Sequence, residues 1–194
     1  MSDLLSALIP VVDALERLGV AYQIGGSVAS SVYGVPRATM DIDLVADLRP
    51  EHVQPLAALL QEQYYINLEA IHEALHRRSS FNLIHLETMV KVDVFVLRER
   101  PYDQEAFRRT RRDTLEEESG REFSLSAPED VILNKLAWFR MGGEVSERQW
   151  NDVIGVLRVQ ANALDVPYLT HWAALLGLAD LLERAFREAQ ISQI

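Results

Sequence analysis

Two aspartates separated by a single residue lie inside an apolar stretch of the chain. Asp41 and Asp43 are flanked by Met40, Ile42 and Leu44, a composition typical of a β-strand, although aspartate is depleted from strands. Because side chains alternate along a strand, both carboxylates are expected on the same face. Their mutual repulsion would cost about 2 kcal/mol, which a divalent cation would offset. The pair therefore predicts a metal site.

A third carboxylate lies further along the chain in a second apolar stretch. Asp93 is centred in residues 89–97, the most hydrophobic strand expected and therefore the central strand of a sheet. A lone acid in such a strand is costly unless it is paired or bound to a metal. Asp93 is thus expected to belong with the first two aspartates.

A glycine-rich turn precedes the first acidic strand. Gly25 and Gly26 interrupt the strand expected at 20–24, and Ser27 is expected to cap a short helix that ends near Tyr33. Backbone N–H groups at the start of a helix can bind an anion. A metal site and an anion site close together in the sequence indicate nucleotide chemistry.

The elements that must position these residues follow from hydrophobic periodicity and from the Gly and Pro positions. Helices are expected at residues 3–18, 27–33, 50–63, 69–77, 102–111, 128–141, 146–160, 166–176 and 178–190. Strands are expected at 20–24, 39–46, 80–86 and 89–97, with a hairpin over 113–125 that turns at Ser119-Gly120. The predicted fold is α+β: a core at 1–125 with a mixed sheet flanked by helices, and a C-terminal helical region at 126–194.

Composition narrows the function classes. The 194 residues carry a net charge of −10, which argues against broad nucleic-acid binding, and the absence of cysteine excludes disulfides and thiolate metal sites. The basic run Arg108–Arg112 is followed by Glu116–Glu118 and is better explained as a solvated helix end than as an RNA-binding patch. Without a basic leader or a run of roughly 18 apolar residues, a cytoplasmic protein with no membrane contact is expected.

The order and spacing of these motifs resemble the nucleotidyltransferase superfamily of polymerase-beta-like fold over residues 20–97. The resemblance implies that Asp41 and Asp43 hold two Mg²⁺ ions and that Asp93 completes the second metal site and accepts a proton from the acceptor hydroxyl. It also implies that the turn of Gly25, Gly26 and Ser27 binds the β- and γ-phosphates of an NTP. Arg37 fits two roles equally, holding a phosphate or pairing with one of the aspartates of 41–43.

The helical region contains a second motif. Lys135 lies beside the apolar stripe of its helix, and Arg148 and Asp152 follow at i,i+4 spacing. This pattern resembles AbiEii-type nucleotidyltransferases, the toxins of some toxin–antitoxin pairs. The resemblance implies that Lys135 contacts the nucleotide phosphates, that Asp152 assists catalysis or orients the substrate, and that an antitoxin protein is a partner. From the residues alone, a snorkelling lysine and a surface Arg148–Asp152 pair explain the pattern nearly as well.

The resulting hypothesis is a Mg²⁺-dependent transfer of NMP from an NTP to an RNA end, a protein hydroxyl or a small molecule such as an aminoglycoside. A toxin of a toxin–antitoxin system is its biological setting by resemblance. The alternative class is a non-catalytic nucleotide-binding or interaction module on the same fold. Such a module is expected to lack a metal carboxylate or the Gly-Ser turn, and both are present here.

Overall fold

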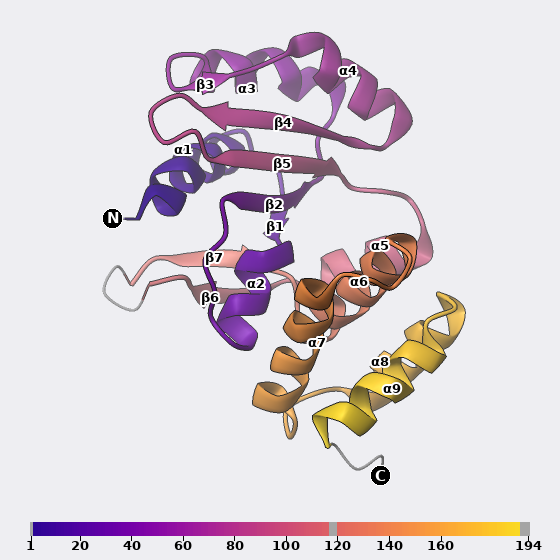
Figure 1. Ribbon diagram of the computed structural model, residues 1–194. Coiled ribbons are helices and arrows are strands. Elements are labelled where there is room, and N and C mark those ends of the chain that lie inside the picture. Colours follow the sequence, from indigo (N-terminus) through magenta and orange to yellow (C-terminus); the bar gives the residue numbers. More distant parts are fainter. Residues whose placement is uncertain (1, 117–119, 191–194) are drawn as a thin grey trace. The chain divides into compact units, whose positions relative to one another are not determined.

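The computed structural model describes residues 2–116 and 120–190, shown as a ribbon in Figure 1. The chain divides into two compact units. The first unit contains the residues up to 25 together with 39–108, and the second contains 26–38 together with the residues from 109 onward. The chain therefore passes from one unit to the other three times.

The first unit is built on a mixed sheet whose central strand carries Asp93. Its strands are β1 (Tyr22–Ile24), β2 (Asp41–Ala46), β3 (Tyr64–Tyr65), β4 (Ser80–His85) and β5 (Lys91–Val96), in the order β3-β4-β5-β2-β1. Strands β2 and β5 are parallel, and the other pairs in this unit are antiparallel. Its helices are α1 (Asp3–Arg17), the 3₁₀ turn η1 (Pro50–His52), α3 (Val53–Leu60), α4 (Leu68–Arg77) and α5 (Pro101–Arg108).

One face of this sheet is buried, and on its two middle acidic strands that face is entirely apolar. Every second residue of β2 and β5 is buried, namely Ile42, Leu44, Ala46, Val92, Val94 and Val96. Helices α1 and α4 pack near these strands, and α1 contributes a buried stripe that includes Leu8 and Leu15. The alternation sends the intervening residues of both strands, the aspartates among them, to the opposite face.

The second unit combines one early helix with the C-terminal part of the chain. It contains α2 (Gly26–Tyr33), the hairpin of β6 (Arg111–Thr114) and β7 (Glu122–Leu125), and the helices α6 (Pro128–Met141), α7 (Glu147–Gln160), α8 (Val166–Leu175) and α9 (Ala179–Ala189). Helix α2 packs against α6 and α7. This packing explains why α2 groups with the C-terminal helices, so the division differs from the boundary expected between residues 125 and 126.

The residue after α2 lies against the backbone of α7. A Cβ atom added to Gly34 would lie 2.8 Å from the backbone nitrogen of Val156 and 2.9 Å from the carbonyl oxygen of Ser30. Both neighbours are backbone atoms, so no side-chain rotation can relieve the contact. The absence of a side chain at residue 34 is therefore what allows this segment to approach α7.

We expect Gly34→Ala to destabilise the protein by about 2 kcal/mol, because over-packing a tight contact shifts the backbone. Urea unfolding followed by circular dichroism measures the loss. Gly142→Ala is the matched control, since the nearest atom to its added Cβ is the Trp138 oxygen at 3.3 Å and its backbone is unstrained. Equal stability of the two variants would contradict the tight contact.

Most predicted elements are confirmed, and the differences have local causes. Strand β3 is only two residues long, too short to leave a periodic pattern. The helix expected to reach Arg111 ends at Arg108, because Arg111 pairs with Leu125 as the first residue of the hairpin. Both strands of that hairpin are confirmed, while its expected turn at Ser119 lies outside the described residues, as do Glu117 and Glu118.

The start of α2 also differs from the prediction. The helix begins at Gly26, so Ser27 lies inside its first turn and does not cap it. Gly26 has a φ of +54°, a left-handed conformation that glycine adopts without strain. The glycine is therefore needed at this position for the backbone to enter the helix.

Across residues 2–116 and 120–190, no helix combines the length and the apolar character that a membrane crossing requires.

Candidate functional site

The first unit places the three predicted carboxylates on one face of its sheet. In the parallel pairing of β2 and β5, Asp43 is the register partner of Asp93, and Asp41 is the register partner of Lys91. Residues paired in register on neighbouring strands project to the same side, at a strand spacing of about 4.8 Å. The prediction that Asp41 and Asp43 share a face is thereby confirmed, and Asp93 shares it with them.

A lysine that the sequence reasoning overlooked lies among these carboxylates. The Lys91 ammonium nitrogen is 2.8 Å from Oδ2 of Asp93 and 3.8 Å from Oδ1 of Asp41. The hydrogen bond to Asp93 raises the pKa of Lys91; burial opposes this effect, and the charges of Asp93, Asp41 and Asp43 add to it. The signal was available in the sequence, because Lys91 lies two residues before Asp93 on the same strand and so on the same face.

Asp93 has a further polar neighbour on the other side. The Asn82 amide on β4 donates a hydrogen bond of 3.3 Å to Oδ1 of Asp93, and Asn82 is its register partner on that strand. Asp93 is thus held by one neighbour on β4 and by Lys91 on its own strand. We name Asp41, Asp43, Lys91 and Asp93 the carboxylate face.

The donor chemistry of the carboxylate face fits a hard divalent cation. Mg²⁺ prefers oxygen ligands, and three carboxylates on one face supply them. In the described part of the chain, however, no three His, Cys, Asp or Glu side chains are gathered closely enough to hold a metal ion. On this face the Lys91 ammonium already lies against the carboxylates of Asp93 and Asp41 and offsets one of their charges.

The glycine turn is anchored to the same strand. The Gly25 N–H donates a hydrogen bond of 2.9 Å to the carbonyl oxygen of Asp43, and the next residue begins α2. This backbone contact fixes the turn against β2 and engages the Gly25 N–H, so the role in anion binding stays a prediction for Gly26 and Ser27.

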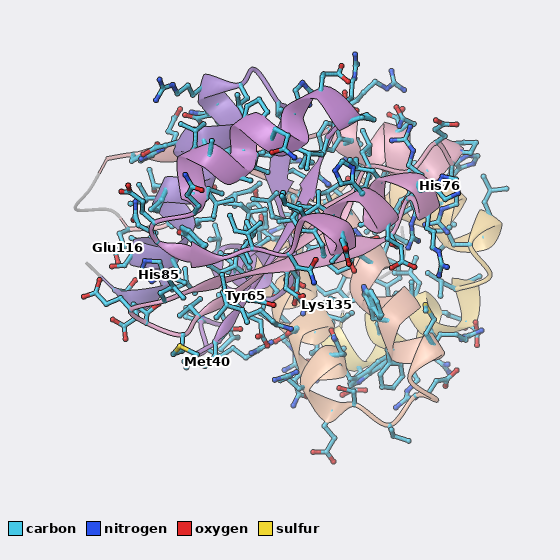
Figure 2. All side chains as sticks on the ribbon, turned by 90° about the horizontal axis from the view of Figure 1, so that it is seen from above. Met40, Tyr65, His76, His85, Glu116 and Lys135 are labelled. Atoms are coloured by element: carbon cyan, nitrogen blue, oxygen red, sulfur yellow. The ribbon has the colours of Figure 1, made fainter. Side chains whose placement is uncertain are left out.

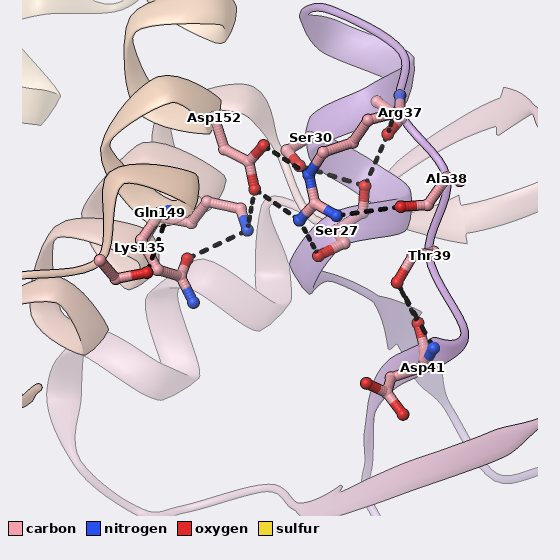
Figure 3. A network of polar contacts seen from close by, with 11 residues as sticks. Ser27, Ser30, Arg37, Ala38, Thr39, Asp41, Lys135, Gln149 and Asp152 are labelled. Atoms are coloured by element: carbon pink, nitrogen blue, oxygen red, sulfur yellow. Dashed lines mark hydrogen bonds and ion pairs between the residues drawn. The ribbon is translucent and has the colours of Figure 1, made fainter.

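The second unit contains a separate polar cluster, drawn in Figure 3. Asp152 on α7 accepts hydrogen bonds of 2.8 Å from both Nε and Nη2 of Arg37, and its Oδ2 lies 2.7 Å from the Lys135 ammonium. Lys135 also donates to the Gln149 side chain at 3.2 Å, and Arg37 donates a short hydrogen bond to the Ser27 hydroxyl. We name Ser27, Arg37, Lys135, Gln149 and Asp152 the Asp152 cluster.

The charges of the Asp152 cluster do not cancel. Two cations share one carboxylate, and the side chains of Lys135 and Asp152 are only 5% and 6% exposed. Burial alone would raise the pKa of Asp152, but the hydrogen bonds and charges of Arg37 and Lys135 outweigh it and lower that pKa. The carboxylate is therefore ionised at neutral pH, and the cluster keeps one unit of positive charge.

This arrangement corrects three sequence interpretations. The partners of Asp152 are Arg37 and Lys135, not Arg148, whose side chain is exposed. Lys135 is buried and ion-paired, which excludes the snorkelling alternative. Of the two roles considered for Arg37, an ion pair is present, but its partner is Asp152 and not an aspartate of the strand motif.

Part of the arginine run Arg108–Arg112, which leads into the hairpin, is structural. Arg109 binds Glu129 at 2.9 Å and lies 3.8 Å from the centre of the Tyr168 ring, while Arg111 lies 3.6 Å from Glu129. Glu129 is fully buried, so these arginines compensate an internal charge. The run is therefore partly engaged inside the second unit, which leaves less of it for an RNA-binding patch.

No protein-family model and no curated protein matches the sequence. Solved structures do match. ANT(2'')-Ia in complex with adenylyl-2''-tobramycin aligns with a TM-score of 0.59 and 13% identity over 90% of this chain and 97% of that one. The chain has the nucleotidyltransferase fold.

Two further structures share the nucleotidyltransferase fold with this chain. The nucleotidyltransferase-like protein from Paracoccidioides brasiliensis aligns at a TM-score of 0.55 and 18% identity over 96% of this chain and 93% of that one. The lincosamide antibiotic adenylyltransferase LnuA, solved with lincomycin bound, aligns at 0.50 and 17% over 77% of this chain and 93% of that one. The nucleotidyltransferase fold confirms the predicted α+β class; at these identities the likeness is one of fold.

Proposed function

We propose that this protein is a Mg²⁺-dependent nucleotidyltransferase that moves an NMP from an NTP to a hydroxyl acceptor. The observation that supports this most is the carboxylate face, where three aspartates share one side of a sheet within a nucleotidyltransferase fold. Asp41, Asp43 and Asp93 would hold two Mg²⁺ ions, which would supply charge neutralisation at the triphosphate.

The chemical step requires no covalent intermediate with the protein. The acceptor oxygen bonds to the α-phosphorus, the bond from that phosphorus to the bridging oxygen breaks, and pyrophosphate leaves. In the proposal, Asp93 takes the proton of the acceptor hydroxyl. Catalysis then consists mainly of positioning the reactants and of balancing charge.

The phosphates require positive charge and N–H donors. Gly26 and Ser27 would supply backbone N–H groups at the start of α2, Gly25 would form the turn that places them, and Arg37 and Lys135 would supply charge. Asp152 holds both cations by direct hydrogen bonds. With its pKa lowered and its oxygens engaged, Asp152 suits the orienting role that the sequence motif left open, and we assign it that role rather than proton transfer.

For the acceptor, a cationic small molecule is the first candidate. The net charge of −10 favours a positively charged substrate and opposes RNA. Two of the proteins with this fold were solved with adenylyl-2''-tobramycin and with lincomycin. On the first unit, the Tyr65 side chain, labelled in Figure 2, is 58% exposed. Its register partner on β4 is Ile84, which in turn pairs with Lys91 of the carboxylate face. This aromatic side chain suits contact with an acceptor.

The toxin setting is the second candidate. It depends on the resemblance of Lys135 and Asp152 to the AbiEii pattern, and the buried Lys135–Asp152 pair supports a defined role for both. In that setting an antitoxin protein would be a partner, and the acceptor would be an RNA end or a protein hydroxyl. Either setting uses cellular NTPs, so we place the activity in the cytoplasm.

Incubation with each labelled NTP tests the proposal. Separate reactions contain a panel of aminoglycosides and lincosamides, total RNA, or total protein, and the labelled product identifies base and acceptor together. Asp43→Ala is the inactive control. Mg²⁺-NTP binding without transfer to any acceptor would favour the non-catalytic module, and absence of both binding and transfer would refute the proposal.

We expect Lys135→Met to weaken Mg²⁺-NTP binding several-fold, because the cluster then loses its net positive charge. Isothermal titration calorimetry measures the change. Arg187→Met, which removes an exposed charge on α9, is the matched control for net charge. Unchanged affinity in Lys135→Met would assign Lys135 a structural role only.

A further inference from the structure

The chain uses lysine at only two positions. Of its nineteen lysines and arginines, Lys91 and Lys135 are the only lysines. Each contacts a predicted site aspartate, Lys91 at Asp93 and Lys135 at Asp152. Lysine presents a compact, flexible point charge, whereas arginine presents a rigid planar fork. Lys91 is therefore one of two lysines in a chain whose other basic residues are arginines, and it lies against Asp41 and Asp93 of the carboxylate face.

The position of Lys91 links two strands. Its backbone pairs with Asp41 across the β2–β5 ladder, and its side chain reaches along β5 to Asp93. One ammonium group thus contacts carboxylates of both strands, at 2.8 Å and 3.8 Å. These are two of the three carboxylates that the proposed function assigns to metal.

We propose that Lys91 is a built-in counter-ion, which holds Asp41 and Asp93 together in the metal-free protein and is displaced when a divalent cation binds. The inference rests on the proposed function for the identity of the cation site. An ammonium 2.8 Å from Oδ2 of Asp93 engages that oxygen and repels a second cation. Lysine and metal therefore compete for the same oxygens.

The competition has two consequences for the free protein. Without metal, the Lys91 ammonium offsets one of the three carboxylate charges, so their mutual repulsion destabilises the sheet less. The affinity for a free divalent cation is also held down, so that metal binds strongly only when it arrives with a triphosphate. Removing the lysine charge should reverse both effects.

Calorimetric titration with Mn²⁺, a probe for the Mg²⁺ site, tests the second effect. Lys91→Met should bind Mn²⁺ roughly tenfold more tightly than the wild type, because a unit charge beside the site is gone. Lys91→Arg keeps the charge and should bind no more tightly than the wild type. Arg77→Met, an exposed charge on α4 paired with Glu73, controls for net charge.

Thermal unfolding in EDTA tests the first effect. Lys91→Met should melt at a lower temperature than the wild type, and added Mn²⁺ should raise its melting temperature more than that of the wild type. Folding only in the presence of Mn²⁺ would support the proposal in its strongest form. If Lys91→Met does not fold in either condition, Lys91→Gln is measured in its place and interpreted in the same way.

The failures of the two proposals are distinguishable. If Asp93→Asn binds Mn²⁺ as tightly as the wild type, Asp93 is not a metal ligand. The proposed metal site, and the proposed function with it, would then be refuted. Binding that depends on Asp93 but is no tighter in Lys91→Met than in the wild type would overturn the role of Lys91 alone. Equal tightening in Lys91→Arg would also overturn it, because charge could not then be the cause.

Discussion

Asp93→Asn is expected to reduce NMP transfer by about 10³-fold or more, the scale of losing a group that balances transition-state charge. The substitution keeps the size of the side chain and removes its charge and its capacity to accept a proton. It also removes the ion pair with Lys91, whose side chain is 39% exposed, so the cost in stability should be small. The fold should therefore persist while the activity is lost.

Steady-state kinetics with labelled NTP measure this loss, and circular dichroism confirms that the fold is retained. Asp47→Asn is the matched control, since Asp47 follows β2 on the same unit and pairs with the exposed Arg49 at 3.5 Å. The control should retain full activity. Near-wild-type transfer by Asp93→Asn would exclude Asp93 from the reaction and leave the other two aspartates without their expected partner.

Asp152→Ala is expected to reduce the free energy of unfolding by about 3 kcal/mol, because it leaves the buried ammonium of Lys135 and the guanidinium of Arg37 without their shared carboxylate. Denaturant unfolding measures the loss. Asp180→Ala removes an exposed carboxylate that binds Arg140 at 2.7 Å and should cost much less. The comparison isolates the effect of burial.

Two further measurements distinguish an unpaired charge from lost packing. Adding Lys135→Met to Asp152→Ala should recover part of the stability, because one buried cation is removed with its partner. If the double variant loses as much free energy of unfolding as the two single variants together, the charge interpretation would be contradicted. The pH dependence provides the second measurement.

The lowered pKa of Asp152 fixes the direction of this dependence. In the unfolded chain Asp152 protonates near 3.8, and in the folded protein only at lower pH. Its contribution to stability is therefore fully present above about pH 4 and is lost as the pH falls through the folded-state value. Asp152→Asn should accordingly show a weaker loss of stability with acid than the wild type.

The sequence alone predicted the parts of this protein that depend on local pattern. Strand alternation placed Asp41 and Asp43 on one face, and the apolar character of residues 89–97 placed Asp93 on the central strand. Helical periodicity predicted the helices from residue 128 onward nearly to the residue. In each case the signal is contained within about ten neighbouring residues.

What the sequence could not supply is pairing across long separations. Arg37 and Asp152 are 115 residues apart, and nothing local to Arg37 distinguishes Asp152 from the nearer aspartates 41 and 43. The packing of Gly34 against Val156 likewise depends on tertiary contact, and it is what groups α2 with the C-terminal helices. Lys91 was overlooked because a lysine at a polar position of an alternating strand pattern is typical of an ordinary solvent-exposed strand residue.

Because the chain crosses between its two units three times, no single truncation point separates one unit from the other. Residues 26–38 contain α2, Gly34 and Arg37. In the sequence they lie far before α6 and α7, the helices against which α2 packs. A fragment from residue 109 onward would lack this segment, and a fragment ending at 108 would carry it without its partners. No single break in the reading frame separates two self-sufficient halves, so truncated products should be degraded rather than accumulate as partial proteins.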